Sequence, residues 1–225
     1  MPDLAVLFDL DGTLIDSEGL WWRAECAVVA DLGGEWTPDD QAHCLGGPLE
    51  RVAAYMADRT GSSRSPAVIG QELLDRMEAL LRQEPLAWRP GARDLLATCR
   101  AEGVPTGLVS ASHRRLLDAV ADAIAREVGA DDGRAFDVTV AGDEVDNGKP
   151  HPEPYVAAAA MLGVAIDQCV VLEDSPTGVA SGQQSGAFVV AVPHIVDIPP
   201  AARRRVLTTL EGVTPDDLRA WKNAR

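Results

Sequence analysis

Four short polar stretches carry the side chains of this sequence that could do chemistry. They contain the carboxylates Asp9 and Asp11, the hydroxyl of Ser110, the ammonium of Lys149, and the adjacent carboxylates Glu173 and Asp174. Each stretch directly follows an apolar run typical of a strand, or lies in the loop after one. The carboxyl ends of parallel strands meet at one edge of a sheet, where open α/β sheets bind ligands, so all four stretches would converge there.

Each of these residues also has an ordinary explanation when it is considered alone. Ser110 could cap a helix, and Lys149 could be a solvated loop lysine. Glu173 and Asp174 could favour the positive end of a following helix. Their joint placement favours chemistry, because four carboxylates brought together repel one another unless a cation or protonation relieves them. Mg²⁺ takes oxygen ligands and suits such a cluster, and a lysine and a hydroxyl beside it would complete a phosphate site.

The first stretch has the sequence Val-Leu-Phe-Asp-Leu-Asp-Gly-Thr. Its apolar start predicts a buried strand over residues 4–11, and alternation along that strand would place Asp9 and Asp11 on one side. An Asp-Gly pair is also a strong hairpin signal. The residues after it lack strand alternation and lead into a helical pattern from Leu20, so the functional interpretation is favoured over the hairpin.

The rest of the chain predicts the elements that must position these residues. Residues 17–82 contain helical patterns broken by Gly and Pro, and no convincing strand. Strands are then predicted near residues 104–110, 136–140, 169–174, 188–193 and 206–210. Helical patterns separate most of these strands and hairpin signals are few, which predicts an α/β fold with a doubly wound, mainly parallel sheet covered by helices.

The early helical segment predicts a subdomain of its own, inserted after the first strand. Its helices are expected at residues 20–32, 49–59 and 68–81, bounded by Gly and Pro. We therefore divide the chain into an α/β core of residues 1–16 and 86–225 and an α-helical cap of residues 17–85.

The composition argues against several classes of function. The 225-residue chain has a formal net charge of -15, whereas nucleic acids and anionic membranes are bound by clustered Lys and Arg. The four cysteines are widely spaced and form no CxxC pair, so no zinc site is predicted. Asp9 and Asp11 interrupt the only early apolar stretch, which argues against a signal peptide, and the longest apolar run is too short to span a bilayer. We expect a soluble, cytoplasmic protein that is a monomer or a weak dimer.

The four stretches together resemble the motifs of the haloacid dehalogenase-like hydrolase superfamily, in particular its phosphatases and β-phosphoglucomutase-like members. In chain order, the four motifs are matched by Asp9-Leu-Asp11-Gly-Thr, Val-Ser110-Ala-Ser, Gly-Lys149-Pro-His-Pro and Glu173-Asp174-Ser. The resemblance covers nearly the whole chain. It implies a Rossmann-like core with a helical cap after the first motif, in agreement with the division above.

The resemblance implies a two-step hydrolysis through a covalent intermediate. Asp9 would attack the substrate phosphorus and form an aspartyl-phosphate. Asp11 would protonate the leaving oxygen and then accept a proton from the attacking water. Mg²⁺ would be held by the Asp9 side chain, the Asp11 main-chain carbonyl and Asp174, with Glu173 in or near the coordination shell.

The remaining motif residues are implied to stabilise the phosphoryl group. Lys149 would offset the negative charge of Asp9 and of the phosphoryl oxygens. Ser110 and the main-chain amide of Ala111 would donate hydrogen bonds to those oxygens.

The resemblance also narrows the substrate to a small phosphorylated metabolite. Asp11 favours phosphoryl chemistry, because dehalogenases of the superfamily lack this second acid. The β-phosphoglucomutase-like mutases carry a histidine in the first cap helix and an arginine after the cap glycine loop. Neither stands at the matching positions here unless Arg23 or Arg51 substitutes. A phosphatase for a sugar or sugar-alcohol phosphate is therefore predicted, with a phosphosugar mutase as the alternative.

Substrate selection is expected from the cap, where the sequence is less informative. Glu18, Trp22 and the loop residues Gly46 and Gly47 are predicted to meet the leaving group. Trp21 and Trp22 would point about 100° apart on a helix, so at most one of them would reach a site. Core packing within the cap is the alternative for either tryptophan.

A protein that binds a phosphorylated metabolite without turning it over is an alternative of another class. Such a protein would be expected to have lost an acid or the lysine, whereas Asp9, Asp11, Lys149 and Asp174 are all present. Receiver domains also combine acids, a hydroxyl and a lysine, but they have no cap insertion and no second acid two residues after the first. Catalysis is therefore favoured.

Overall fold

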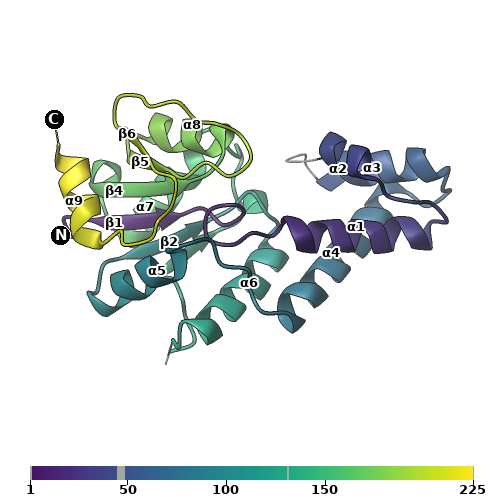
Figure 1. The fold of residues 1–225 in the computed structure, drawn as a ribbon, viewed down its shortest axis with the longest axis horizontal. Coiled ribbons are helices and arrows are strands. Elements are labelled where there is room, and N and C mark those ends of the chain that lie inside the picture. The colour runs from purple at the N-terminus through teal and green to yellow at the C-terminus, as the bar shows by residue number, and fades with distance from the viewer. Residues whose placement is uncertain (1, 45–48, 131, 225) are drawn as a thin grey trace. The chain divides into compact units, whose positions relative to one another are not determined.

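The computed structural model describes residues 2–44, 49–130 and 132–224 (Figure 1). The chain folds into two compact units. The first consists of Met1–Asp16 together with Leu86–Arg225, and the second of Ser17–Pro85. Among the described residues, no helix is long and apolar enough to cross a membrane.

The first unit is built on a six-stranded sheet in which every neighbouring pair of strands is parallel. Across the sheet the strands are β3 (Val138–Val140), β2 (Thr106–Val109), β1 (Ala5–Phe8), β4 (Cys169–Glu173), β5 (Phe188–Ala191) and β6 (Arg204–Val206). The central strands β1 and β4 are completely buried, which explains their continuous apolar runs. The predicted α/β fold with a mainly parallel sheet is confirmed.

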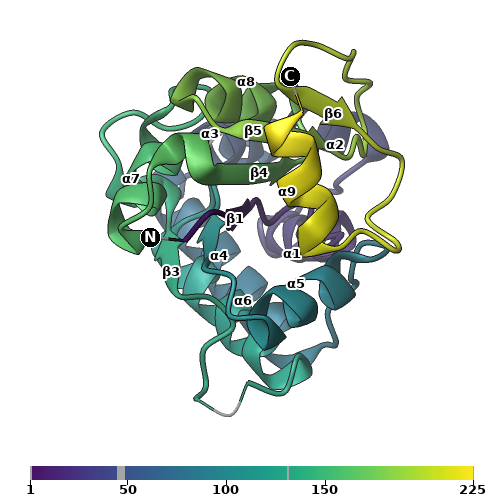
Figure 2. The same ribbon diagram turned by 90° about the vertical axis from the view of Figure 1, so that its left-hand side faces the viewer.

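Helices cover both faces of this sheet (Figure 2). On one face lie α7 (Glu153–Leu162) and α8 (Pro176–Ser185), whose residues Tyr155 and Val179 share a buried core with Leu7 and Val171 of the sheet. Helices α5 (Ala92–Ala101), α6 (Arg114–Glu127) and α9 (Pro215–Asn223) lie on the other side. Two short 3-10 helices, η1 (Gly142–Glu144) and η2 (Ile166–Gln168), occupy connections between strands and helices.

The second unit is entirely helical among its described residues. It contains α1 (Glu18–Asp31), α2 (Pro38–Cys44), α3 (Leu49–Thr60) and α4 (Pro66–Gln83). Helix α4 packs against both α1 and α3, and it begins where Ser65 accepts a hydrogen bond from the Val68 amide and Pro66 takes the first turn. Helix α2 was not predicted, because it has seven residues with two buried side chains. So short a segment shows no helical periodicity of apolar residues.

Two strand predictions are wrong at their ends. The first strand ends at Phe8 and not at residue 11, because Leu10 begins a turn in which the Leu14 amide donates to the Leu10 carbonyl. The strand predicted at 206–210 lies at Arg204–Val206. The first difference matters for the site, since the turn orients Asp11, whereas Asp9 precedes the turn and its amide still donates to the Leu172 carbonyl of β4 at 3.0 Å.

Candidate active site

Three strands end together at the edge of the sheet that carries the predicted motifs. Phe8 of β1 pairs in register with Leu108 of β2 and Leu172 of β4. Asp9 and Glu173 therefore lie one residue beyond this paired row, and Ser110 lies two residues beyond it. All three side chains are buried. The parallel arrangement brings together residues that are up to 164 positions apart in the chain because strand ends share one edge.

Lys149 reaches this edge from the loop before α7. Its Nζ lies 2.6 Å from Asp9 Oδ1 and 2.8 Å from Glu173 Oε1, and it donates to the Val109 carbonyl at 3.0 Å. Only 6% of the lysine side chain is exposed, which excludes the solvated-loop interpretation. Helix α8 holds the loop, because Ser181 Oγ donates to the His151 carbonyl at 2.6 Å and Gln184 donates to the Pro150 carbonyl at 3.2 Å.

Asp11 lies beside the serines that follow β2. Ser112 Oγ donates to Asp11 Oδ2 at 3.0 Å, and Ser110 Oγ lies 3.4 Å from the same oxygen. The Ser110 hydroxyl in turn accepts a hydrogen bond from the Ser112 amide at 2.9 Å. The structure thus brings the second motif to the second acid of the first motif.

The electrostatics of the cluster are dominated by burial and by like charges. Burial and the Glu173 carboxylate raise the pKa of Asp9 well above its usual range, against the opposing effect of Lys149. Burial and Glu173 also raise the pKa of Asp174 to about 7. Burial disfavours the charged form of Lys149, but Asp9 and Glu173 outweigh it and raise the pKa of the lysine well above its ordinary value. One ammonium group therefore faces several carboxylates, and a divalent cation would relieve the excess negative charge.

The donor set suits a hard cation such as Mg²⁺. Asp9, Glu173 and Asp174 each offer a carboxylate oxygen, and these oxygens lie within 4.8 Å of one another. Within the described part of the chain, no other residue donates a hydrogen bond to Asp9 Oδ2 or to the Asp174 carboxylate. Gly12, at φ +86°, makes the approach possible, since a Cβ there would lie 2.1 Å from Asp174 Oδ2.

The predicted substrate-binding residues are distributed over both units. Ala111 is exposed directly after Ser110 in the first unit. Glu18 and Trp22 are partly buried on α1 of the second unit. Gly46 and Gly47 lie outside the described residues. The roles of all five stay predictions.

Sequence reasoning gave no role to three further residues at this edge. Ser112 donates a hydrogen bond to Asp11, and the sequence distinguished it only as a neighbour of Ser110. Tyr155 is completely buried and its hydroxyl donates to Glu173 Oε1 at 2.9 Å. His194 follows β5 with its Nε2 3.8 Å from Asp16, and its Nδ1 lies 3.2 Å from where a Gly12 Cβ would stand. An aromatic residue in an apolar helix carries no signal of such a contact, because the same pattern serves ordinary packing.

Comparison with known proteins agrees with the fold and the motifs. The sequence profile described as haloacid dehalogenase-like hydrolase matches residues 4–186. Hexitol phosphatase B of Escherichia coli O157:H7 is 34% identical over 225 residues, covering 96% of each chain. The chain belongs to the haloacid dehalogenase-like hydrolases, and the predicted resemblance is confirmed.

Solved structures show the same similarity over nearly all of the chain. A mutant of CbbY from Rhodobacter sphaeroides in complex with xylulose-(1,5)bisphosphate superposes with a TM-score of 0.78 at 28% identity, covering 95% of this chain and 98% of that one. A β-phosphoglucomutase from Clostridium difficile has the same fold, with a TM-score of 0.74 at 19% identity over 97% of this chain and 96% of that one.

Proposed function

We propose that this protein is a magnesium-dependent phosphatase that hydrolyses a sugar or sugar-alcohol phosphate through an aspartyl-phosphate on Asp9. The observation that carries the proposal is the contact of the buried Lys149 ammonium with Asp9 at 2.6 Å, beside the second acid Asp11. A nucleophilic carboxylate, a fixed cation and a nearby acid are the groups that phosphoryl transfer from a monoester needs.

In the first step, a carboxylate oxygen of Asp9 forms a bond to phosphorus as the bond from phosphorus to the sugar oxygen breaks. Asp11 gives its proton to that leaving oxygen. In the second step, water attacks the phosphorus of the aspartyl-phosphate and gives a proton to Asp11, while the bond from phosphorus to the Asp9 oxygen breaks. The products are inorganic phosphate and Asp9 in its original state.

The other residues of the site stabilise charge during both steps. The Lys149 ammonium group contacts Asp9 Oδ1, so it offsets negative charge on the nucleophile and on the phosphoryl group. Ser110 and the Ala111 amide donate hydrogen bonds to the phosphoryl oxygens. Asp9, Asp174 and the Asp11 carbonyl would hold Mg²⁺, which supplies positive charge where the phosphoryl oxygens bind.

Two observations favour a phosphatase over a phosphosugar mutase. Arg23, one of the two arginines that could replace the missing mutase residue, is ion-paired with Glu84 inside the helical unit. The relative at 34% identity bears the name of a hexitol phosphatase. We assign substrate selection to residues 17–85, with Glu18, Trp22, Gly46 and Gly47 as the residues that meet the leaving group.

The experiment is to measure phosphate release from hexose, pentose, hexitol, glycolate and glycerol phosphates, with Mg²⁺ and with EDTA. Parallel assays follow conversion of β-glucose 1-phosphate to glucose 6-phosphate. We expect magnesium-dependent release, fastest from a sugar or hexitol phosphate. Isomerisation without release would replace the phosphatase by the mutase, and binding without any turnover by the folded protein would favour a phosphometabolite-binding role.

A further inference from the structure

The carboxylate of Glu173 is already surrounded by hydrogen-bond donors. Its Oε1 accepts from Lys149 Nζ at 2.8 Å and from the Tyr155 hydroxyl at 2.9 Å. Its Oε2 accepts from the Asp174 amide at 3.1 Å, and from the amide and the hydroxyl of Ser175 at 3.2 and 3.1 Å. A carboxylate offers about four lone-pair sites, so these five donors leave little capacity for a metal ion.

Helix α8 closes the remaining side of Glu173. A Cβ at Gly178, in its first turn, would lie 1.6 Å from Glu173 Oε1. Only 1% of the glutamate is exposed. Glu173 is thus enclosed by protein groups, whereas no other described residue donates a hydrogen bond to Asp9 Oδ2 or to the Asp174 carboxylate.

Each hydrogen of the Lys149 ammonium group has an acceptor, just as both oxygens of Glu173 have donors. An ammonium group has three hydrogens, and the Nζ of Lys149 has three acceptors, which are Asp9 Oδ1, Glu173 Oε1 and the Val109 carbonyl. The Tyr155 ring lies beneath this ammonium group, with 4.9 Å between Nζ and the ring centroid. The position of Lys149 against Asp9 therefore depends on where Glu173 Oε1 stands.

We propose that Tyr155 is a positioning residue, which through its hydroxyl bond to Glu173 holds Lys149 in place against Asp9. Glu173 accordingly supports the lysine and the loop of Asp174, and Asp9 and Asp174 are the carboxylates that serve the metal. The catalytic part of this inference rests on the proposed function. Without the hydroxyl, Glu173 Oε1 has one donor instead of two, and Lys149 moves toward it and away from Asp9.

The chain contains a matched control for the loss of one tyrosine hydroxyl. Tyr55 of α3 donates to Asp40 Oδ1 at 2.7 Å, and Asp40, like Glu173, is a buried carboxylate. Tyr155→Phe and Tyr55→Phe therefore remove the same group from the same kind of bond while leaving each ring in its packing. We expect both variants to be somewhat less stable, and only Tyr155→Phe to change the site.

The first measurement is the steady-state kinetics of both variants with the best substrate of the panel. We expect Tyr155→Phe to lower kcat about tenfold with little change in KM, and to raise the inhibition constant of inorganic phosphate by a similar factor. Calorimetry should give a Mg²⁺ dissociation constant within about twofold of the parent protein. Tyr55→Phe should leave kcat unchanged.

The second measurement needs neither substrate nor metal. Lys149 and Lys222 are the two lysines of the sequence, so mass spectrometry can follow reductive methylation of each, with Lys222 as the internal reference. We expect Tyr155→Phe to raise the rate of methylation of Lys149, relative to that of Lys222, about tenfold. Tyr55→Phe should leave this ratio of rates unchanged. This readout stands even if the parent protein hydrolyses no phosphate ester, which would refute the proposed function alone.

Two results would overturn the inference. Unchanged kcat and unchanged Lys149 reactivity in Tyr155→Phe would reduce Tyr155 to a packing residue. A weaker Mg²⁺ affinity of Tyr155→Phe with unchanged Lys149 reactivity would instead show that Glu173 belongs to the coordination shell of the metal.

Discussion

Asp9 is the residue on which the proposed chemistry of the site depends most. Its carboxylate is buried, one oxygen faces Lys149, and the other accepts no hydrogen bond among the described residues. Burial and Glu173 raise the pKa of Asp9, so its ionised form depends on Lys149 and on any bound cation. At this scale the charges of neighbouring side chains decide whether Asp9, the proposed nucleophile, is ionised.

We predict that Asp9→Asn abolishes turnover, with kcat lower by at least about 10³-fold, because an amide cannot form the acyl phosphate. The circular dichroism spectrum should stay that of the parent protein, since the two side chains have nearly the same shape. Wild-type turnover in this variant would show that the nucleophile is another group.

At the scale of elements, the turn after β1 places Asp11 near the sheet edge at which Asp9 directly follows the strand. The Gly12 amide donates to the Ile15 carbonyl at 2.8 Å, and Gly12 has a φ of +86°. No side chain fits at this position, because Asp174 approaches from the end of β4. The motif needs glycine here for two separate reasons, its backbone conformation and the close approach of a carboxylate.

We predict that Gly12→Ala weakens Mg²⁺ binding by more than about tenfold and lowers the free energy of unfolding by more than roughly 1 kcal/mol, the cost of a left-handed alanine alone. Gly129→Ala is the control, since Gly129 has a φ of +67° and open space around its Cβ position. Calorimetric titration with Mg²⁺ and thermal unfolding test both variants. Equal Mg²⁺ affinity in the two would mean that Asp174 is not displaced.

The segment that re-enters the first unit after residue 85 is fixed by α6. Glu127 accepts from the Leu86 amide at 2.9 Å and from the Trp88 indole nitrogen at 2.6 Å. The Ile15–Trp88 bridge joins this segment to the turn after β1. Both crossings of the chain between its two units are therefore tied to the core by specific hydrogen bonds.

We predict that Glu127→Ala lowers the free energy of unfolding by about 1–3 kcal/mol, because two part-buried donors lose their acceptor. Hydrogen exchange at the Leu86 amide should become faster. Glu211→Ala, at an exposed glutamate, should change neither quantity by a measurable amount. An unchanged Leu86 exchange rate in Glu127→Ala would contradict the anchoring role.

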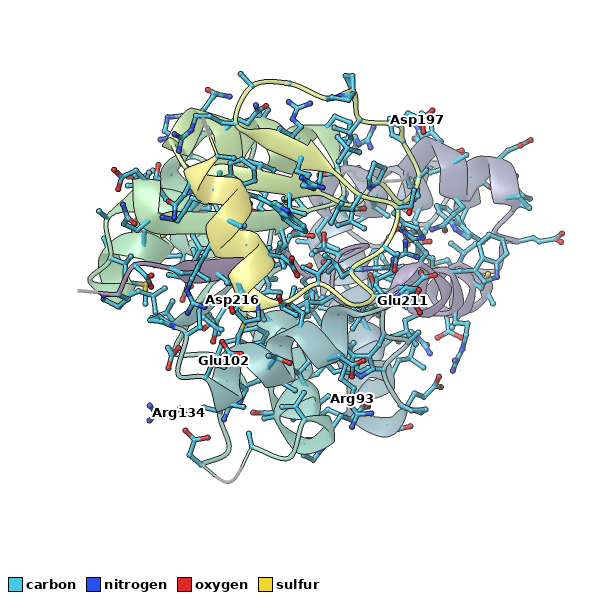
Figure 3. All side chains as sticks on the ribbon, turned by 60° about the vertical axis from the view of Figure 1, so that its left-hand side comes forward. Arg93, Glu102, Arg134, Asp197, Glu211 and Asp216 are labelled. Carbon is cyan, nitrogen blue, oxygen red and sulfur yellow. The ribbon has the colours of Figure 1, made fainter. Side chains whose placement is uncertain are left out.

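At the scale of the whole molecule, charge is distributed unevenly between surface and interior. Exposed acids such as Glu102, Asp197, Glu211 and Asp216 project outward (Figure 3), and they contribute to the net charge of -15. Glu25 is different, because it is buried in the helical unit and accepts a hydrogen bond from the Trp36 indole at 3.1 Å. Burial raises the pKa of Glu25 to about 7.

A raised carboxyl pKa makes stability depend on pH with a definite sign. Below the unfolded value near 4.5 both states hold the proton. Between about 4.5 and 7 the unfolded chain releases it first, so folding becomes less favourable as pH rises, and the loss levels off above about 7.

We therefore predict that Glu25→Gln removes part of the pH dependence of unfolding, on the order of 2 kcal/mol between about pH 5.5 and 8. Urea unfolding of both proteins across this range measures the difference. The comparison with the variant isolates Glu25 from Asp9 and Asp174, whose pKa values are also raised. Parallel pH profiles would show that Glu25 does not hold its proton in the folded state.

The order of the motifs in the sequence was enough to predict the fold class and the family. Apolar runs such as Val170–Leu172 mark strands that are buried on both faces, and their alternation with helical patterns implies a parallel sheet. These signals are local in the chain, so they can be recognised without knowledge of the tertiary structure. The helix α2 and the end of β1 lacked such signals and were missed.

Only the tertiary structure decided which atoms meet. The Lys149–Asp9 contact joins residues 140 positions apart, and Tyr155 reaches Glu173 across the packing of α7 on the sheet. No sequence period records such a contact, because a tyrosine that donates to a buried carboxylate and one that merely fills space have the same pattern. The sequence by itself determined which chemical groups stand at the sheet edge. Packing of α7 on that sheet decided that the Tyr155 hydroxyl joins the donors to Glu173.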